Sequence, residues 1–258
     1  MSNEISFITL PDRRLAYQQL RAAPNQNKPG VIFLSGYGSD MMGTKAGFLA
    51  ERCAAAGRAF LRFDYRGVGQ SSGKFIDGTI GTWFEDTALM FDQLTTGPQL
   101  IIGSSMGGWL GLMLVKQHPH RVSGFIGIAA APDFTENLVR PQLNDKQRTE
   151  LEQDGVTYDE NAPQDFRLPM TKKFLDEAEQ HLLLNKPLQI NAPVHLLQGE
   201  ADTEVPFVYA KRIATAITAP TKKLTLIKDG DHRLSRPADL ALLWDVLETY
   251  IEVPSPTG

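Results

Sequence analysis

Residues 99–115 read QLIIGSSMGGWLGLMLV, in which a β-rich run leads directly into an apolar helical run. The pattern Gly-x-Ser-x-Gly at the junction, residues 103–107, is that of a nucleophile elbow, a sharp strand-to-helix turn that exposes its serine. Only small residues beside the serine let the strand and the helix approach each other. The helical run is apolar nearly all round, which predicts burial against the middle of a sheet. The stretch therefore predicts an α/β fold with Ser105 as the candidate nucleophile.

The same pattern occurs a second time, as GQSSG at residues 69–73. No helical run follows its serine, Ser71, so we interpret Ser71 as a loop residue. The alternative for Ser105 itself is a tight glycine-rich turn that binds nothing. The choice depends on whether catalytic partners follow Ser105 along the chain.

Short β-rich runs alternate with helix-length segments on both sides of the elbow. Apolar strands separated by helices imply right-handed βαβ units and a parallel sheet covered on both faces. The first two strands have no helix between them, so they should pair antiparallel at one edge. The predicted strands are 5–10, 14–19, 31–34, 59–63, 99–102, 122–129, 194–197 and 223–227, and the predicted helices are 44–56, 83–94, 106–117, 207–218 and 238–250.

The alternation breaks between residues 133 and 186, where the chain is polar and helix-like. Helices are expected there over 144–153 and 171–184. Loops at the carboxyl ends of strands carry the ligand in open α/β sheets, so an insertion at this place is expected to be a cap over the site. A separate small domain is the alternative. We predict one catalytic core, residues 1–132 and 187–258, interrupted by a cap at 133–186.

An elbow serine needs a base, and a third group that orients the base. In this fold the acid and then the histidine follow the serine along the chain, each just past a strand end. His232 directly follows the last predicted strand, and Asp202 lies four residues past the strand 194–198. The other histidines fall on a turn, in the insertion or within a strand: His118, His120, His181 and His195. Asp133 is the alternative acid, and Glu200 and Glu204 lie close enough to Asp202 to be confused with it.

Acyl transfer also needs hydrogen-bond donors aimed at the developing oxyanion. The backbone N–H of Met106 is the first candidate. The second should come from the loop after the first central strand, where residues 35–38 read Ser-Gly-Tyr-Gly, and we take it to be the N–H of Tyr37. Glycines let the backbone close on a substrate there. An ordinary turn is the alternative interpretation of this loop.

The composition excludes several functional classes. The 26 Lys and Arg against 30 Asp and Glu residues leave no basic stripe for nucleic acid. The single cysteine, Cys53, excludes a disulfide framework and a cysteine-based metal site, and the histidines show no metal-ligand spacing, so neither metal nor cofactor is expected. Residues 38–45 nearly match a phosphate-binding P-loop, but their threonine and lysine are transposed.

Residues 1–10 lack the features of a secretory signal or a mitochondrial presequence. No apolar run approaches the roughly 18 residues that a membrane span needs. These two features predict a cytoplasmic protein without a membrane span.

These motifs together resemble the α/β-hydrolase superfamily along almost the whole chain. Residues 64–71, DYRGVGQS, are similar to the loop after the fourth strand of that superfamily. Other stretches resemble, more narrowly, mitochondrial abhydrolases that act as palmitoyl-protein thioesterase and mycophenolic acid acyl-glucuronide esterase. These stretches are GY at 36–37, MGTKA at 42–46, RFDY at 62–65, GPQ at 97–99, GSSMGGW at 103–109, FLDEAEQHLLL at 174–184 and DHR at 231–233.

The resemblance implies a mostly parallel eight-stranded sheet with helices on both faces and a small helical cap. It also implies Ser105 as nucleophile, Asp202 as acid and His232 as base. The predicted function is hydrolysis of carboxylic esters or acyl thioesters through an acyl-enzyme. The substrate would be a small-molecule ester or acyl thioester, or an S-acylated protein. Other triad chemistry (perhydrolysis, carbon–carbon hydrolysis, acyl transfer to an alcohol) and a non-catalytic receptor that closes its cap are the alternatives.

Two groups of residues are candidates for substrate contacts. Arg66 and Arg140 are candidates for binding a substrate carboxylate. Apolar residues of the insertion are candidates to line an acyl groove, or else form the apolar faces of its helices: Leu138, Leu143, Phe166, Leu168, Met170 and Phe174.

Overall fold

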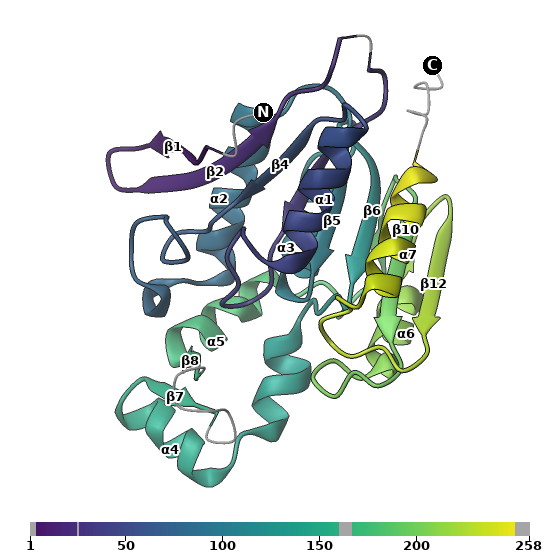
Figure 1. Ribbon diagram of the computed structural model, residues 1–258. Helices are drawn as coiled ribbons and strands as arrows, with labels where there is room; N and C mark the ends of the chain where they lie inside the picture. The colour runs from purple at the N-terminus through teal and green to yellow at the C-terminus, as the bar shows by residue number, and fades with distance from the viewer. Residues whose placement is uncertain (1–3, 25, 160–166, 251–258) are drawn as a thin grey trace.

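An eight-stranded sheet forms the centre of the computed structural model, which describes residues 4–24, 26–159 and 167–250 (Figure 1). In spatial order the strands are β1 (Ser6–Thr9), β2 (Arg14–Leu20), β4 (Phe60–Phe63), β3 (Gly30–Leu34), β5 (Gln99–Ser104), β6 (Val122–Ile128), β10 (Val194–Gly199) and β12 (Lys222–Ile227). β1 and β2 pair antiparallel, β2 and β4 also pair antiparallel, and all other neighbours are parallel. Every residue of β3, β5 and β6 is buried, as a sheet covered on both faces requires.

Helices cover both faces of this sheet. α1 (Thr44–Ala55) and α7 (Pro237–Glu248) pack on one face, and α2 (Ile80–Leu94), α3 (Met106–Gln117) and α6 (Phe207–Ala216) pack on the other (Figure 1). The core strands and helices agree with the sequence prediction to within a few residues. Cys53 is fully buried in the core under α1, where burial raises the pKa of its thiol to about 12.

The insertion, residues 133–186, is a lobe beyond the carboxyl ends of the central strands (Figure 1). Its elements are a π-helical turn η2 (Thr135–Val139), a 3₁₀ turn η3 (Arg140–Gln142), α4 (Asp145–Gln153), the antiparallel pair β7 (Val156–Tyr158) and β8 (Pro169–Thr171), α5 (Lys172–Ala178) and a 3₁₀ turn η5 (Glu179–His181). The prediction of one helix over 171–184 was wrong in length, because α5 ends at Ala178 and tightens into the 3₁₀ turn. Two further short strands, β9 (Leu188–Gln189) and β11 (Ile217–Thr218), pair beside α6.

Two polar contacts join the end of the insertion to the core. The Glu177 carboxylate on α5 accepts the N–H of Gly81, in the first turn of α2, at 3.1 Å. The indole Nε1–H of Trp109 on α3 donates to the carbonyl of His181 at 3.0 Å. α5 and the following turn η5 are therefore fixed against α2 and α3.

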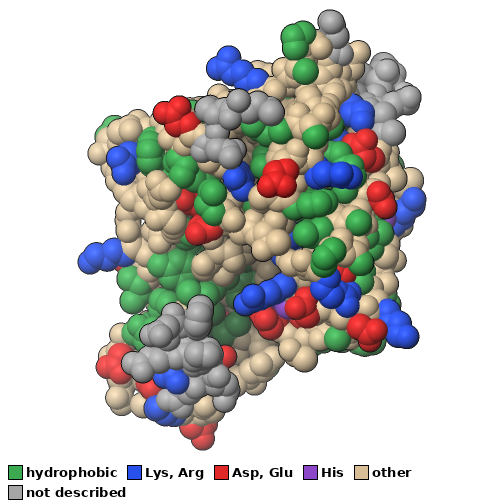
Figure 2. All heavy atoms as spheres, viewed as in Figure 1, with side chains coloured by type: hydrophobic (Ala, Val, Ile, Leu, Met, Phe, Trp, Pro, Cys, Tyr) green, Lys and Arg blue, Asp and Glu red, His purple; other side chains and the backbone are tan. Residues whose placement is uncertain are grey.

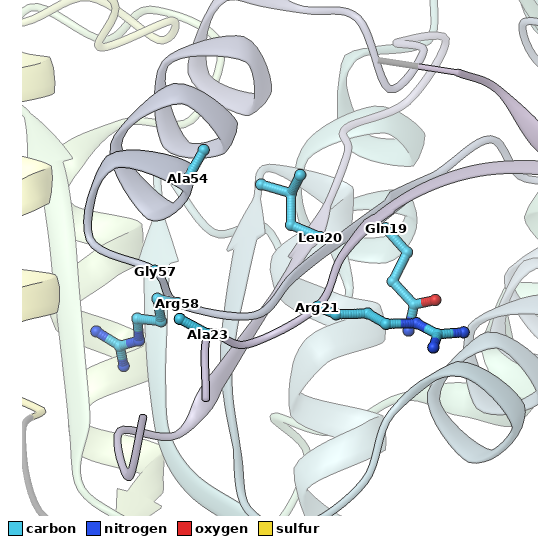
Figure 3. A pocket seen from close by; sticks show the side chains of 7 residues that line it. All are labelled: Gln19, Leu20, Arg21, Ala23, Ala54, Gly57 and Arg58. Carbon is cyan, nitrogen blue, oxygen red and sulfur yellow. The ribbon is translucent and has the colours of Figure 1, made fainter. Parts of the chain in front are cut away.

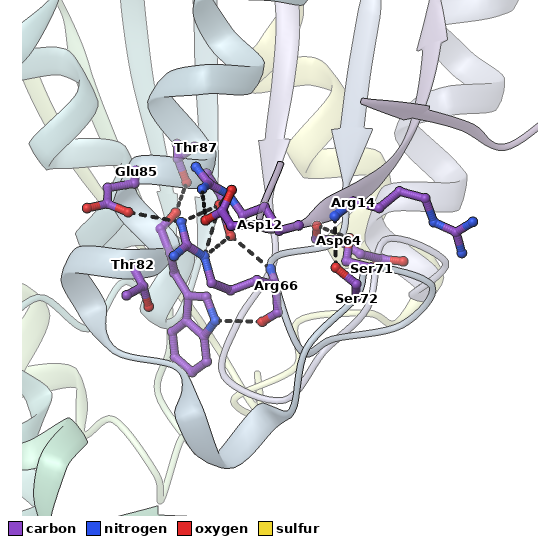
Figure 4. A network of polar contacts seen from close by, with 12 residues as sticks. Asp12, Arg14, Asp64, Arg66, Ser71, Ser72, Thr82, Glu85 and Thr87 are labelled. Carbon is purple, nitrogen blue, oxygen red and sulfur yellow. Dashed lines mark hydrogen bonds and ion pairs between the residues drawn. The ribbon is translucent and has the colours of Figure 1, made fainter. Parts of the chain in front are cut away.

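A buried ion-pair network holds the loop after β4 (Figure 4). The fully buried Asp86 carboxylate on α2 forms ion pairs with Arg13, whose Nε lies 3.1 Å away, and with Arg66, whose Nη2 lies 2.8 Å away. In the same loop the Ser71 hydroxyl accepts the N–H of Ala16 at 2.9 Å and donates to the carbonyl of Asp64 at 2.6 Å. The second Gly-x-Ser-x-Gly pattern thus lies in a loop, as predicted, and its serine ties that loop to β2.

Nothing in the described ranges has the length and apolar character of a membrane-crossing helix. The same ranges contain no group of three or more His, Cys, Asp or Glu side chains placed to hold a metal ion.

Two carboxylates on Arg66 offer a matched test of the network. Asp86 is fully buried, whereas the side chain of Glu85, 2.9 Å from the same guanidinium, is 64% exposed. We predict that Asp86→Ala lowers the free energy of unfolding by about 3 kcal/mol, because it leaves the partly buried Arg13 and Arg66 without this buried carboxylate. Glu85→Ala should cost less than about 1 kcal/mol. Urea titration of both variants measures the difference, and equal losses would contradict it.

Candidate active site

Ser105 occupies a strained turn between β5 and α3. Its φ of 52° and ψ of −119° lie outside the regions that non-glycine residues favour. A Cβ at position 103 would lie 2.3 Å from the carbonyl oxygen of Gly107, and one at position 107 would lie 2.1 Å from that of Leu34. Both flanking positions must therefore be glycine for the strand and helix to meet, as the elbow pattern predicts.

The structure brings Ser105, His232 and Asp202 together from the carboxyl ends of three strands. His232, in the loop between β12 and α7, has its Nε2 3.1 Å from the Oγ of Ser105. Its Nδ1 lies 2.9 Å from Oδ2 of Asp202, which follows β10. The Asp202 side chain is fully buried and the His232 side chain is 16% exposed. This is the geometry of a nucleophile, a base and the group that orients the base.

Asp202 is held by hydrogen bonds to both carboxylate oxygens. Oδ1 accepts the N–H of Glu204 at 2.9 Å and of Val205 at 2.8 Å. Oδ2 accepts Gln198 Nε2 at 2.8 Å besides its bond with His232. Burial alone raises the pKa of Asp202, but the bonds from His232, Val205 and Gln198 outweigh burial, so the pKa lies below its ordinary value. Asp202 is therefore an anion that faces Nδ1 of His232.

Gln198 is a site residue that the sequence analysis missed. It is fully buried at the end of β10, and its Nε2 donates to Asp202 and to the carbonyl of Val205, at 2.8 and 2.9 Å. The signal for it was an amide side chain near the end of a buried strand, because buried polar side chains need partners.

The alternative acids lie elsewhere. Asp133 is buried, but its two oxygens accept the N–H groups of Leu183 and Leu184, at 2.8 and 2.6 Å. It therefore ties the two ends of the insertion together. Glu204 reaches to 3.7 Å from His232 Nε2, but its side chain is 70% exposed on the solvent side. Glu200 is exposed.

The loop of residues 35–41 runs against Ser105. We call it the oxyanion loop, because it carries the predicted donor Tyr37. A Cβ at position 36 would lie 3.3 Å from the Cβ of Ser105, so Gly36 lets the loop approach the serine. Met106 is the first residue of α3, and its N–H has no acceptor within the helix. Of the two predicted donors, Met106 therefore follows Ser105 in the chain, and Tyr37 lies in the loop that packs against Ser105.

Two consecutive residues after β4 anchor this oxyanion loop to the core. The Tyr65 hydroxyl donates to the carbonyl of Ser35 at 3.1 Å, and Asp64 Oδ1 accepts the N–H of Met41 at 2.7 Å. Asp64 Oδ2 also accepts the N–H of Gln70 at 2.8 Å. The sequence analysis quoted this Asp-Tyr pair within stretches that resemble the family but assigned it no role.

The remaining polar candidates have structural partners. Arg66 binds Asp86 and Glu85, and Arg140 binds Glu136, Asp176 and Glu179, so both guanidiniums are occupied. His195 lies within β10 and bonds the hydroxyl of Thr225 at 2.8 Å, and burial lowers its pKa. These residues stabilise the fold and leave the proposed acyl chemistry to Ser105, His232 and Asp202.

A hollow lined by apolar side chains separates the core from the insertion (Figure 2). Aromatic rings pack between the two, with the Tyr37 ring centroid 4.9 Å from that of Phe75 and 5.2 Å from that of Phe174. Of the acyl-groove candidates, Leu168 is 43% exposed, Phe174 is 1% exposed within the core, and Phe166 lies outside the described residues.

A cavity of about 290 Å³ at the opposite end of the sheet is separate from this site (Figure 3). It lies between the end of β2 and the end of α1, beside Ala23 and Gly57. The Arg58 guanidinium points away from it and donates from Nε to the carbonyl of Pro29 at 2.7 Å.

Known proteins are similar to this chain in sequence and in fold. Residues 25–150 match the family described as "Serine aminopeptidase, S33". The Mus musculus protein named "Palmitoyl-protein thioesterase ABHD10, mitochondrial" is 38% identical over 243 residues, which cover 92% of this chain and 79% of that protein. The Homo sapiens protein of the same name is 36% identical over 254 residues, 96% of this chain and 80% of that protein.

The chain belongs to the ABHD10 family of α/β-hydrolases.

Solved structures agree with this family. A putative hydrolase from Agrobacterium vitis S4 superposes with a TM-score of 0.90 at 36% identity, covering 96% of this chain and 99% of that one. Alpha/beta hydrolase domain-containing protein 10 from mouse gives a TM-score of 0.85 at 35% identity, covering 95% and 97%. The α/β-hydrolase fold and the resemblance to the ABHD10 family are confirmed, and the chain is a hydrolase.

The pKa of Asp202 predicts a pH dependence of stability. A carboxyl whose pKa is lower in the folded chain stabilises the fold above the unfolded pKa, and this contribution is lost as pH falls through the folded pKa. Asp202→Asn should therefore be less stable than the wild type at about pH 5. This difference in the free energy of unfolding should narrow as pH falls below 3.8, the ordinary pKa of an aspartate. Urea titration at several pH values measures this difference.

Asp133 is the matched control for this prediction. Burial raises the pKa of Asp133, so its ionised form opposes folding. The stability of the wild type relative to Asp133→Asn should rise as pH falls toward 3.8, opposite in direction to Asp202→Asn. If the stability difference from the wild type changed with pH in the same direction for both variants, the assignment of Asp202 as a stabilised anion would be contradicted.

Proposed function

We propose that this chain is a serine hydrolase that cleaves carboxylic esters or acyl thioesters through an acyl-enzyme on Ser105. The observation that carries the proposal is the alignment of Ser105 Oγ, His232 and Asp202, with separations of 3.1 and 2.9 Å. The strained elbow supports it, because unfavourable backbone conformations of this kind cluster at functional sites.

The proposed reaction has two halves. His232 Nε2 takes the proton of Ser105 Oγ as the oxygen attacks the acyl carbon, and Asp202 stabilises the resulting imidazolium. The N–H groups of Tyr37 and Met106 donate to the oxyanion of the tetrahedral intermediate. His232 then protonates the leaving alcohol or thiol, and the acyl group remains on Ser105. In the second half a water, deprotonated by His232, attacks the acyl carbon. The bond to Ser105 Oγ then breaks, His232 returns the proton to Oγ, and the carboxylic acid is released.

The apolar hollow between the core and the insertion favours substrates with a hydrocarbon acyl chain (Figure 2). The relatives named palmitoyl-protein thioesterase support the same class of substrate, as a small molecule or an S-acylated protein. Leu168 contributes exposed apolar surface directly over the oxyanion loop. We propose that residues 133–186 act as a cap that covers this hollow.

The compartment stays a prediction. The sequence analysis predicted the cytoplasm, whereas the ABHD10 relatives are named mitochondrial.

Replacement of the nucleophile is the first test. If the three residues act as a unit, Ser105→Ala should lower kcat by about 10⁶-fold. Ser72→Ala is the control, because Ser72 lies in the second Gly-x-Ser-x-Gly stretch, where its hydroxyl accepts the N–H of Arg14 at 2.8 Å. Hydrolysis of p-nitrophenyl esters measures both variants. Near-wild-type turnover by Ser105→Ala would overturn the proposed function.

A series of acyl lengths tests the substrate class. We expect kcat/KM for acyl thioesters and p-nitrophenyl esters to rise with chain length, because each buried methylene contributes about 0.8 kcal/mol. The assay compares acetyl, octanoyl and palmitoyl substrates with an acyl glucuronide. Equal, low rates on all of them would argue against an acyl-chain hydrolase and for another chemistry on the same triad.

A further inference from the structure

Tyr37 contacts the insertion through its side chain while its backbone lies beside Ser105. The hydroxyl donates to the carbonyl of Pro169, the first residue of β8. The ring centroid lies 5.2 Å from that of Phe174 on α5 and 6.2 Å from that of Phe134 at the start of the insertion. On the backbone side, the preceding Gly36 is packed against Ser105.

The next residue of the oxyanion loop also contacts the insertion. Gly38 has a φ of +68°, and a Cβ there would lie 2.3 Å from Cδ1 of Leu168. Two consecutive residues of the insertion, Leu168 and Pro169, therefore lie on two consecutive residues of the loop. The bond from Tyr37 persists across neutral and alkaline pH, because burial raises the pKa of its hydroxyl well above the ordinary value.

The hydrogen bonds to the ends and to the middle of the oxyanion loop come from different parts of the molecule. Tyr65 and Asp64, both on the core, bond the ends at Ser35 and Met41. The Tyr37 ring packs on Phe75 of the core, but its hydroxyl bonds the insertion, and Leu168 of the insertion lies on Gly38. A shift of the insertion would therefore act on the part of the loop that carries the proposed oxyanion donor.

We propose that the Tyr37 side chain is a positioning element that couples the placement of the insertion to the oxyanion hole. Its hydroxyl bond to Pro169 fixes the residue whose backbone N–H is the proposed oxyanion donor. This inference rests on the proposed function of Ser105. An oxyanion donor interacts more strongly with the transition state than with the substrate, so loss of its alignment lowers kcat and leaves KM nearly unchanged.

Tyr37→Phe tests the proposal, because it removes the hydroxyl and keeps the ring in its cluster. Tyr158→Phe, which removes an exposed hydroxyl from β7 of the same insertion, is the matched control. Fluorophosphonate titration gives the concentration of active sites. The assays then give kcat per titrated site, KM for a p-nitrophenyl ester, the inhibition constant of an alkyl boronic acid and the melting temperature.

We expect Tyr37→Phe to lower kcat per titrated site about tenfold, part of the 10²–10³-fold cost of losing a whole donor. The boronic acid, whose adduct on Ser105 mimics the tetrahedral intermediate, should bind weaker by a similar factor, and KM should change less than twofold. A merely structural role would lower the titre and the melting temperature but leave kcat per titrated site within twofold of the wild type, and that result overturns the inference. Absence of titration and of turnover in the wild type would instead overturn the proposed function, and the inference with it.

Discussion

The backbone of Ser105 is the constraint on which the site depends. A residue with a φ of 52° persists only where its surroundings determine it, and here they do so on both sides. The N–H of Ser105 donates to the carbonyl of Ile128 at 2.9 Å, and its carbonyl accepts the N–H groups of Gly108 at 2.8 Å and Ala131 at 3.0 Å. The end of β6 therefore fixes the elbow, and the glycines at 103 and 107 let β5 and α3 close around it.

The sheet then sets the position of the partners. Parallel strands end at the same edge, so the loops after β10 and β12 bring Asp202 and His232 to the elbow although they lie 97 and 127 residues further along the chain. Asp202 is buried, and it keeps its charge because N–H donors of Gln198, Glu204 and Val205 replace water around it. The electrostatics of the site are thus built before substrate arrives, which is the condition for stabilising a transition state without reorganisation.

The sequence was informative wherever function depends on residues at strand ends. Ser105, Asp202 and His232 each follow a recognisable apolar strand, so their meeting at one edge could be predicted from strand order. Gln198, Asp64 and Tyr65 could not be assigned roles, because each acts through a hydrogen bond to a loop whose path the sequence does not specify. The same reason explains why Arg66 and Arg140 were open as substrate ligands until their carboxylate partners were seen. The early end of α5 at Ala178 was missed because apolar residues resume at Leu182, four residues on, at the spacing of a continuing helix.

The central claim is that Ser105 carries the acyl group during turnover. The most direct measurement is acid quenching during hydrolysis of a long-chain p-nitrophenyl ester, followed by intact-mass analysis and peptide mapping. The account predicts one acyl adduct on the peptide that contains Ser105, present in the wild type and absent from Ser105→Ala. An adduct on another residue, such as Ser71 or Cys53, or full turnover by Ser105→Ala, would contradict it.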